Sequence, residues 1–259
     1  MIELVLPAFN EEARLPTTIQ ALRNTVAGGD LADSVRVIVV DNASTDRTGD
    51  VAIAENSAEL PVELVSCQIR GKGAAVKAGV AVTTADIVGF MDADGATSLD
   101  ALAASLRLLA LGADAAIASR GLPESVTMVR TSVMRAVGAQ AYRSWARRIV
   151  PGISDTQCGF KLMQGDLARR IFPQLVTRGF SFDVELLARL QRDGAQIAEF
   201  ATTWVDVPGS TFSPARHGLE SFAELASIRR MLRNGHRVPG AASGLTARVP
   251  LAVQAPISS

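Results

Sequence analysis

The chain has 259 residues and a mass of 27.2 kDa, with 48% hydrophobic and 20% charged residues. This length fits one large α/β domain. The composition predicts an ordinary core with a solvated surface, which excludes a disordered or fibrous protein. Lysine plus arginine number 26, as do aspartate plus glutamate, so the formal charge is zero. That balance argues against the strongly basic surface of a nucleic-acid-binding domain.

Membrane, secreted and zinc-binding classes are also disfavoured. The longest stretch without a charged residue, 249–259, has eleven residues, whereas a spanning helix needs about 20 mostly apolar ones. The amino terminus lacks the basic and long apolar regions of a signal peptide. Two scattered cysteines and two histidines cannot form a disulfide framework or a zinc site of usual spacing. We therefore expect a cytosolic protein in which carboxylates hold any metal ion.

The first half of the chain alternates short apolar runs with helical patterns, which is typical of βαβ units and a parallel sheet. The predicted strands cover 2–6, 35–40, 62–65, 87–91 and 115–118. The predicted helices cover 11–26, 44–55, 73–82 and 98–111. Ser44 and Ser98 are the expected N-caps of the second and fourth helices. The predicted fold class is α/β, with a mostly parallel central sheet flanked by helices.

The second half has a different texture. Between Ser125 and Ser154 there are five arginines and no acidic residue, with apolar residues interleaved, so we predict a basic amphipathic helix over 126–150. Further strands are predicted at 160–162 and 197–207, and further helices at 183–191 and 217–234. The segment 237–259 is rich in Ala, Gly, Ser and Pro and is predicted to be a disordered tail. Residues 1–236 are predicted to form a single domain.

Three polar clusters directly follow predicted strands. They are Pro7-Ala8-Phe9-Asn10-Glu11, Asp41-Asn42-Ala43-Ser44-Thr45-Asp46 and Asp92-Ala93-Asp94-Gly95. Ligands of open α/β sheets bind beyond the carboxyl ends of the strands, so we expect the clusters to meet at one site. The Asp92–Asp94 pair suits Mg²⁺ or Mn²⁺, which bind through one or two carboxylates plus substrate phosphates. A turn is the alternative for this pair, because Asp and Gly favour turns.

Arg70-Gly71-Lys72-Gly73 precedes a predicted helix. Glycine and lysine at a helix N-terminus suit a pyrophosphate. The segment matches neither the Walker loop nor the G-x-G-x-x-G pattern. A plain glycine turn is the alternative.

Taken together, these motifs resemble family 2 glycosyltransferases of the GT-A fold. Three later motifs extend the likeness to the polyprenyl-phosphate branch, which includes dolichyl-phosphate β-glucosyltransferases. They are Ala118-Ser119-Arg120, Asp155-Thr156-Gln157-Cys158-Gly159-Phe160-Lys161-Leu162 and Phe182-Asp183-Val184-Glu185-Leu186-Leu187. The likeness runs from about residue 2 to about 235, and it implies a nucleotide-sugar half at 1–120 and an acceptor half at 121–236.

The resemblance implies a role for each matched residue. The residues implied to bind the nucleotide sugar are Pro7, Phe9, Asn10, Glu11, Asp41, Lys72, Asp92 and Gln157. Those implied to bind the acceptor phosphate are Ser119, Arg120 and Arg130. Asp92 and Asp94 match the metal motif, with Mg²⁺ or Mn²⁺ as the implied ion. The implied catalytic residues are Asp92, Asp94 and Asp183.

The implied reaction is an inverting, metal-dependent transfer of a hexose, glucose from UDP-glucose or else mannose from GDP-mannose, to a polyprenyl or dolichyl phosphate. A phosphate acceptor is already an anion and needs no strong base. An alcohol acceptor would need one, and Asp183 is then the candidate. The alternatives are a soluble family 2 transferase acting on a small molecule, and a non-catalytic nucleotide-sugar-binding module. The intact Asp41, Asp92, Asp94 and Arg120 argue against the module.

The basic helix also has two interpretations. It lies on an anionic membrane surface, or its apolar face packs on the domain. The first agrees with a lipid acceptor and predicts a cytoplasmic protein that is peripheral on the cytoplasmic membrane face. The sequence leaves the oligomeric state open, and a homo-oligomer is compatible with it.

Overall fold

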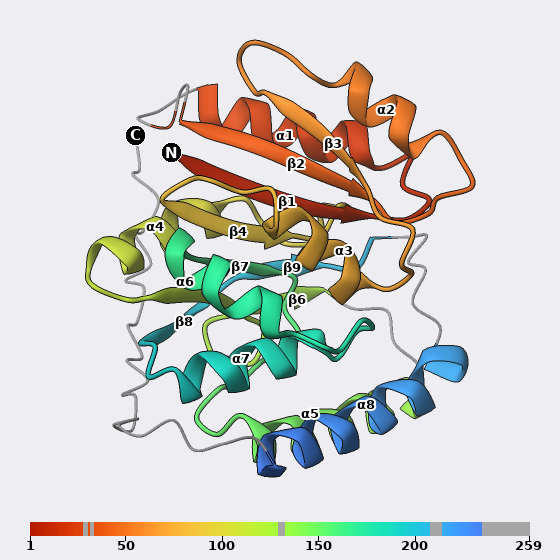
Figure 1. Cartoon of the computed structure of the whole chain (residues 1–259), viewed down its shortest axis with the longest axis vertical. Helices are drawn as coiled ribbons and strands as arrows, with labels where there is room; N and C mark the ends of the chain where they lie inside the picture. Colours follow the sequence, from red (N-terminus) through yellow and green to blue (C-terminus); the bar gives the residue numbers. More distant parts are fainter. Residues whose placement is uncertain (28–30, 32–33, 129–132, 208–213, 235–259) are drawn as a thin grey trace, which may run out of the picture.

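The computed structural model describes residues 1–27, 31, 34–128, 133–207 and 214–234. Its main feature is a seven-stranded sheet in the order β3-β2-β1-β4-β7-β5-β8 (Figure 1). The strands are β1 Ile2–Ala8, β2 Val35–Asp41, β3 Val62–Ser66, β4 Ile87–Met91, β5 Ala115–Ser119, β7 Phe160–Gln164 and β8 Ile197–Ala201. All run parallel except β7, which pairs antiparallel with β4 and with β5. The predicted α/β class with a mostly parallel sheet is confirmed.

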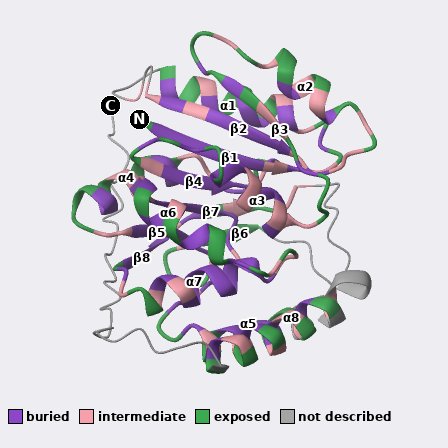
Figure 2. Cartoon of the chain, in the orientation of Figure 1, coloured by how far each residue is buried: buried purple, intermediate pink, exposed green. Residues whose placement is uncertain are grey.

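Helices cover both faces of the sheet because the central strands are apolar on both sides. On β1, Leu4 and Leu6 belong to one buried cluster and Val5 to the other. The helices of the first cluster are α1 Leu15–Ala27, α2 Thr48–Ala54 and α4 Asp100–Ala110. Those of the second are α3 Lys72–Val80, α5 Val133–Ile149, α6 Gly165–Ile171, α7 Phe182–Arg192 and α8 Pro214–Asn234, with the short 3₁₀ helix η1 Phe172–Gln174. Figure 2 shows the resulting buried sheet and the partly exposed α5 and α8.

A two-stranded ribbon lies outside the main sheet. It consists of β6 Val126–Met128 and β9 Thr203–Val205. The predicted basic helix over 126–150 is therefore wrong at its start, since 126–128 pair with β9 and the helix α5 begins at Val133. Two of these three residues, Val126 and Thr127, are β-branched, and β-branched residues favour strands. The predicted tail lies outside the described residues.

Three predicted helix starts are also wrong. α1 begins at Leu15, four residues after the predicted start at Glu11. α2 begins at Thr48, because Ser44 turns its hydroxyl to the backbone N–H of Asn10 (3.1 Å) and Asp46 instead accepts the Thr48 N–H (3.0 Å). α4 begins at Asp100, two residues after Ser98. Across the part of the chain that the structure describes, every helix is too short or too polar to cross a membrane.

Candidate active site

The ends of β1 and β2 lie side by side, since Ala8 pairs with Asp41. The loops beyond them are tied together by side chains. Asn10, which has a left-handed φ of 56°, accepts the N–H of Thr45 on its Oδ1 at 2.8 Å. The backbone N–H of Glu11 donates to the Thr48 hydroxyl at 2.8 Å. Pro7, at the end of β1, and Phe9, just beyond it, are half-buried beside these loops.

Asn42 holds the start of α3 at the same edge. Its Nδ2 donates to the carbonyl oxygens of Cys67 (3.1 Å) and Ile69 (2.7 Å), and its Oδ1 accepts the Gly71 N–H (2.8 Å). Gly71 has a φ of 124°, and a Cβ there would lie 2.2 Å from the carbonyl oxygen of Arg178. Only glycine fits this position. The result is that Lys72, the first residue of α3, lies at the carboxyl edge of the sheet.

Asp92 and Asp94 follow β4 at the centre of the edge. The Lys72 ammonium lies 2.5 Å from Asp92 Oδ1, and Asp94 Oδ1 accepts the Ala96 N–H at 3.0 Å. A Cβ on Gly159 would lie 1.9 Å from Asp92 Oδ2, so the backbone before β7 packs directly on this carboxylate. Three predicted site residues are thus brought together from β4 and α3.

The charges at this edge perturb one another. Burial raises the pKa of the Asp94 carboxyl, and the neighbouring Asp92 charge raises it further. Burial also raises the pKa of Glu11, against the lowering effect of Arg14, with smaller contributions from Asp94 and Asp92. For Lys72, burial alone would lower the pKa, but Asp92 and Asp183 overcome it and raise the pKa. The carboxylates at this edge therefore carry more negative charge than the single Lys72 ammonium balances.

A divalent cation fits this donor set. Within the described residues no group of three His, Cys, Asp or Glu side chains could hold a metal ion. Mg²⁺ needs fewer protein ligands than three, because it usually binds through one or two carboxylates and substrate phosphates complete its coordination. Asp92 and Asp94 would supply these two carboxylates. A cation beside Asp94 would also relieve the carboxylate repulsion that raises its pKa.

Asp183 lies at the start of α7 and forms a buried ion pair. Lys161 Nζ lies 2.6 Å from Asp183 Oδ1 and also donates to the carbonyl oxygens of Thr156 (3.2 Å) and Cys158 (2.8 Å). Burial raises the pKa of Asp183, against the lowering effect of the Lys161 and Lys72 ammonium groups. Because Lys161 binds the carbonyl oxygens of Thr156 and Cys158 as well as Asp183, the ion pair fixes the loop that carries Gln157. The half-buried Gln157 itself donates its backbone N–H to Asp155 Oδ1 at 3.0 Å.

Arg120, just beyond β5, is held by two groups. Its guanidinium makes a bidentate contact with Asp155 (2.6 and 3.1 Å), and its Cζ lies 5.4 Å from the ring centroid of Trp204 on β9. Burial alone would raise the pKa of Asp155, but Arg120 lowers it to about 2. Ser119, at the end of β5, is fully buried and accepts the Gly121 N–H on its hydroxyl at 3.3 Å. Arg130 lies outside the described residues.

Sequence reasoning gave no site role to Asp155, Trp204, Lys161 or Asn42. Asp155 precedes Gln157 by two residues in a quoted motif, and Lys161 stands as a lone charge in an apolar strand. Those were the available signals for these two residues. Asn42 follows a strand end directly, whereas Trp204 had no local signal, because its contact with Arg120 spans 84 positions.

The large apolar side chains of α5 that can be described pack on the domain. Tyr142 and Trp145 pack on Phe222 of α8, with ring centroids 5.9 and 5.8 Å apart. Arg143 and Arg147 lie on the exposed side. For this half of α5, the interpretation in which the apolar face packs on the domain is the one observed.

The sheet order, its single antiparallel strand and the carboxylate pair after β4 match the GT-A fold. Solved structures agree: mannosyl-3-phosphoglycerate synthase from Rubrobacter xylanophilus has a TM-score of 0.66 at 19% identity, covering 93% of this chain and 78% of that one. Glucosyl-3-phosphoglycerate synthase from Mycobacterium tuberculosis, in complex with Mn²⁺ and UDP-glucose, has a TM-score of 0.64 at 22% identity, covering 91% and 80%. These similarities bear on the fold.

Sequence comparison identifies the family. The model of the Glycosyl transferase family 2 matches residues 3–172. Dolichyl-phosphate beta-glucosyltransferase of Drosophila melanogaster is 33% identical over 241 residues, covering 88% of this chain and 74% of that protein. The Dictyostelium discoideum protein of the same name is 31% identical, covering 88% and 73%. The chain belongs to glycosyl transferase family 2, and it is a glycosyltransferase.

Proposed function

We propose that the chain is a metal-dependent, inverting hexosyltransferase that moves glucose from UDP-glucose to a dolichyl or other polyprenyl phosphate. The observation that carries the proposal is the 2.5 Å contact of Lys72 with Asp92, beside Asp94 at the sheet edge. An ammonium at a helix start and two carboxylates are the charges that a nucleotide diphosphate and its cation require. The relatives named dolichyl-phosphate beta-glucosyltransferase, 31–33% identical, support both the sugar and the acceptor.

On the donor side, Asp92 and Asp94 would hold Mg²⁺ or Mn²⁺. When bound, such an ion stabilises the diphosphate as it gains negative charge on leaving the sugar. Lys72 adds a second positive charge beside Asp92, and its raised pKa keeps it protonated at neutral pH. The loops of Phe9–Glu11 and Asp41, locked by the contacts of Asn10, would receive the base and ribose.

On the acceptor side, Arg120 would bind the lipid phosphate, since a guanidinium binds phosphate through two parallel hydrogen bonds. A phosphate oxygen then bonds to the anomeric carbon as the bond from that carbon to the diphosphate oxygen breaks on the opposite face. The acceptor enters as an anion, so no base is needed. In this reaction Asp183 is a positioning residue, which acts through Lys161 on the loop of Gln157.

An apolar ribbon next to Arg120 supports a lipid acceptor. Val126 and Met128 on β6 are 49% and 59% exposed, and Val205 on β9 is 43% exposed. Val205 adjoins Trp204, on which Arg120 stacks. Exposed apolar groups beside a phosphate-binding arginine suit an acceptor with a phosphate head and a hydrocarbon chain. With such an acceptor, we propose that the protein acts as a peripheral protein on the cytoplasmic face of a membrane.

The test is a transfer assay. Purified protein is incubated with Mn²⁺ or Mg²⁺, a short-chain polyprenyl phosphate and radiolabelled UDP-glucose or GDP-mannose. We expect label from UDP-glucose to enter the organic phase, and EDTA to prevent it. Label transferred from GDP-mannose alone would overturn the donor assignment. UDP release that depends on a soluble acceptor, with an unlabelled organic phase, would overturn the lipid acceptor.

A matched pair of variants isolates the carboxylates. Asp94→Asn should lower the rate at least a hundredfold, because it removes a charge from the ion and from the developing transition state. Asp166→Asn removes the same charge from a side chain that is 94% exposed on α6, and it should leave the rate unchanged. Equal rates in the two variants would contradict the role of Asp94.

A further inference from the structure

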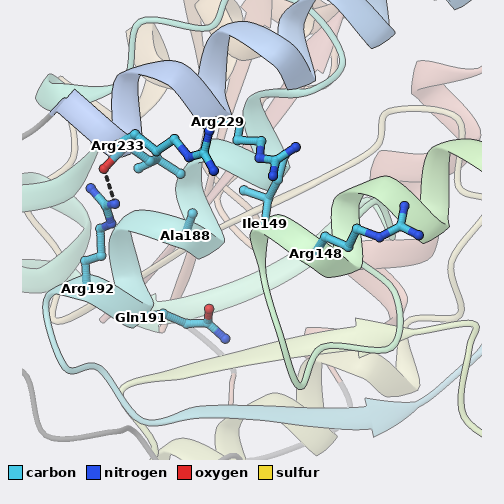
Figure 3. A pocket seen from close by; sticks show the side chains of 8 residues that line it. Arg148, Ile149, Ala188, Gln191, Arg192, Arg229 and Arg233 are labelled. Carbon is cyan, nitrogen blue, oxygen red and sulfur yellow. Dashed lines mark hydrogen bonds between the residues drawn. The ribbon is translucent and has the colours of Figure 1, made fainter.

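A pocket of about 470 Å³ lies between the C-terminal parts of α5, α7 and α8 (Figure 3). Four arginines line it: Arg148 from α5, Arg192 from α7, and Arg229 and Arg233 from α8. Ile149 and Leu232 add apolar surface to the same lining. The volume is within the range of small-molecule sites, which combine apolar walls with a few polar groups.

The pocket is separate from the candidate active site. α7 begins beside that site at Phe182 and Asp183 and ends at Arg192 in the pocket. Nine residues at 1.5 Å each put about 14 Å of helix between Asp183 and Arg192. In Figure 1 the C-terminal end of α8 likewise lies away from the end of the sheet where β1 and β2 terminate. A ligand in the pocket would therefore be distinct from the donor and the acceptor.

Within the part of the chain that the structure describes, no ion pair neutralises the positive charge of the pocket. None of the four arginines is in an ion pair with a described residue. The neighbouring acidic side chains are engaged elsewhere: Asp193 pairs with Arg170 at 2.6 Å, and Glu224 accepts the N–H groups of Gly179 and Ser181. The sequence from 225 to 259 contains no acidic residue at all.

Helix capping accounts for the position of Arg192 and does not account for the other three arginines. Arginines near helix C-termini complement the helix dipole, and Arg192 donates to the Leu232 carbonyl oxygen. Among the described residues, none accepts a hydrogen bond from Arg148, Arg229 or Arg233, although Arg148 and Arg229 line the same cavity from different helices. All four arginines are exposed, so water and salt screen part of their mutual repulsion, and an anion between them would offset the rest.

We propose that this pocket binds a phosphate-bearing anion. Clusters of arginines recognise phosphate through charge-assisted, bidentate hydrogen bonds, and the apolar lining would contact a carbon part attached to the phosphate. The phosphate belongs either to a soluble molecule or to a lipid headgroup, and the chemistry of the pocket is the same for both. Such a ligand would bridge α5 and α8 to α7, whose other end carries Asp183.

The proposal is tested by titration of the purified chain with inorganic phosphate by calorimetry, in EDTA so that no metal ion takes part. A second arm measures co-sedimentation with vesicles of phosphatidic acid in phosphatidylcholine. We expect saturable binding in at least one arm. Phosphate binding assigns a soluble source, and binding to vesicles alone assigns a lipid headgroup. Absence of binding in both arms would overturn the proposal.

A matched pair of double variants separates the pocket from the general charge of the surface. Arg229→Gln with Arg233→Gln should weaken binding at least tenfold. Arg143→Gln with Arg230→Gln removes two exposed charges from α5 and α8 outside the pocket, and it should change binding less than twofold. Equal weakening by both pairs would reduce the effect to non-specific attraction and refute the site. Thermal unfolding of each variant confirms that it is folded.

Discussion

The Lys161 ammonium lies 2.6 Å from Asp183 Oδ1, and the two side chains are 0% and 2% exposed. This pair joins β7 to the first turn of α7, and Lys161 also binds two carbonyl oxygens of the loop before β7. Removing one partner of a buried ion pair leaves an uncompensated charge, whereas removing both leaves none. The contact is thus a strong structural link within the candidate active site.

Lys161→Met should therefore lower the free energy of unfolding by about 3–5 kcal/mol. Adding Asp183→Asn to this variant should restore part of the loss, because the unpaired carboxylate is then gone. Urea denaturation of the two variants and of the parent chain measures the effect. A double variant that is less stable than Lys161→Met alone would contradict the explanation.

Much of the candidate site was predictable because strand ends are local signals. The polar residues that follow β1, β2 and β4 interrupt apolar runs, and parallel strands bring such residues to one edge. The Lys161–Asp183 pair was not predictable in this way. Its partners are 22 positions apart, and their contact depends on β7 lying antiparallel between β4 and β5, for which no local pattern exists.

Helix starts were less predictable than strand ends. Ser44 has the right residue type and spacing for an N-cap, yet its hydroxyl bonds to the backbone of Asn10 in another loop. Instead, Asp46 Oδ1 accepts hydrogen bonds from the backbone N–H and the hydroxyl of Thr48, the first residue of the helix. Both serine hydroxyls and carboxylates can accept a free helix N–H, and tertiary contacts decide which of them is available. The sequence alone contains no measure of that competition.

Gly159→Ala should displace Asp92 of the Asp92–Asp94 pair, although the substitution lies far from both residues in the sequence. The added Cβ would lie 1.9 Å from Asp92 Oδ2, so Asp92 must move away from its place beside Lys72. We expect kcat/KM to fall at least tenfold, which corresponds to about 1.4 kcal/mol.

Gly138→Ala is the matched control, since among the described residues no atom outside its own stretch of helix lies within 4 Å of a Cβ at this position in α5. It should leave kcat/KM unchanged and raise the free energy of unfolding by about 1 kcal/mol, because alanine is the better helix former. A Gly159→Ala enzyme with full activity would show that Asp92 can shift without consequence.

Acid should weaken the Arg120–Asp155 contact. The folded-state pKa of Asp155 is lowered to about 2 by Arg120, whereas an unfolded chain has an Asp pKa of about 3.9. A lowered folded-state pKa stabilises the fold above the unfolded value, and that stability is lost as the pH falls towards about 2. The contribution is about 2 kcal/mol.

The stability difference between the parent chain and Asp155→Asn should therefore shrink by about 2 kcal/mol between pH 5 and pH 2. Urea denaturation at several pH values measures it. Asp166→Asn, changed at an exposed carboxyl, should follow the parent chain in parallel across the range. A difference for Asp155→Asn that stays constant with pH would refute the assignment.

Lys72 should compete with the cation for Asp92. Its ammonium lies 2.5 Å from Oδ1 of Asp92, one of the two carboxylates proposed to hold the ion. Lys72→Met removes that positive charge, so Mn²⁺ alone should bind more tightly, by roughly tenfold or about 1.4 kcal/mol. The titration is followed by electron paramagnetic resonance of free Mn²⁺. Arg70→Met removes an equal charge from an exposed side chain two residues earlier, and its affinity should match that of the parent chain. Weaker Mn²⁺ binding by Lys72→Met would mean that Lys72 supports the cation site through structure, and that the ion does not displace it from Asp92.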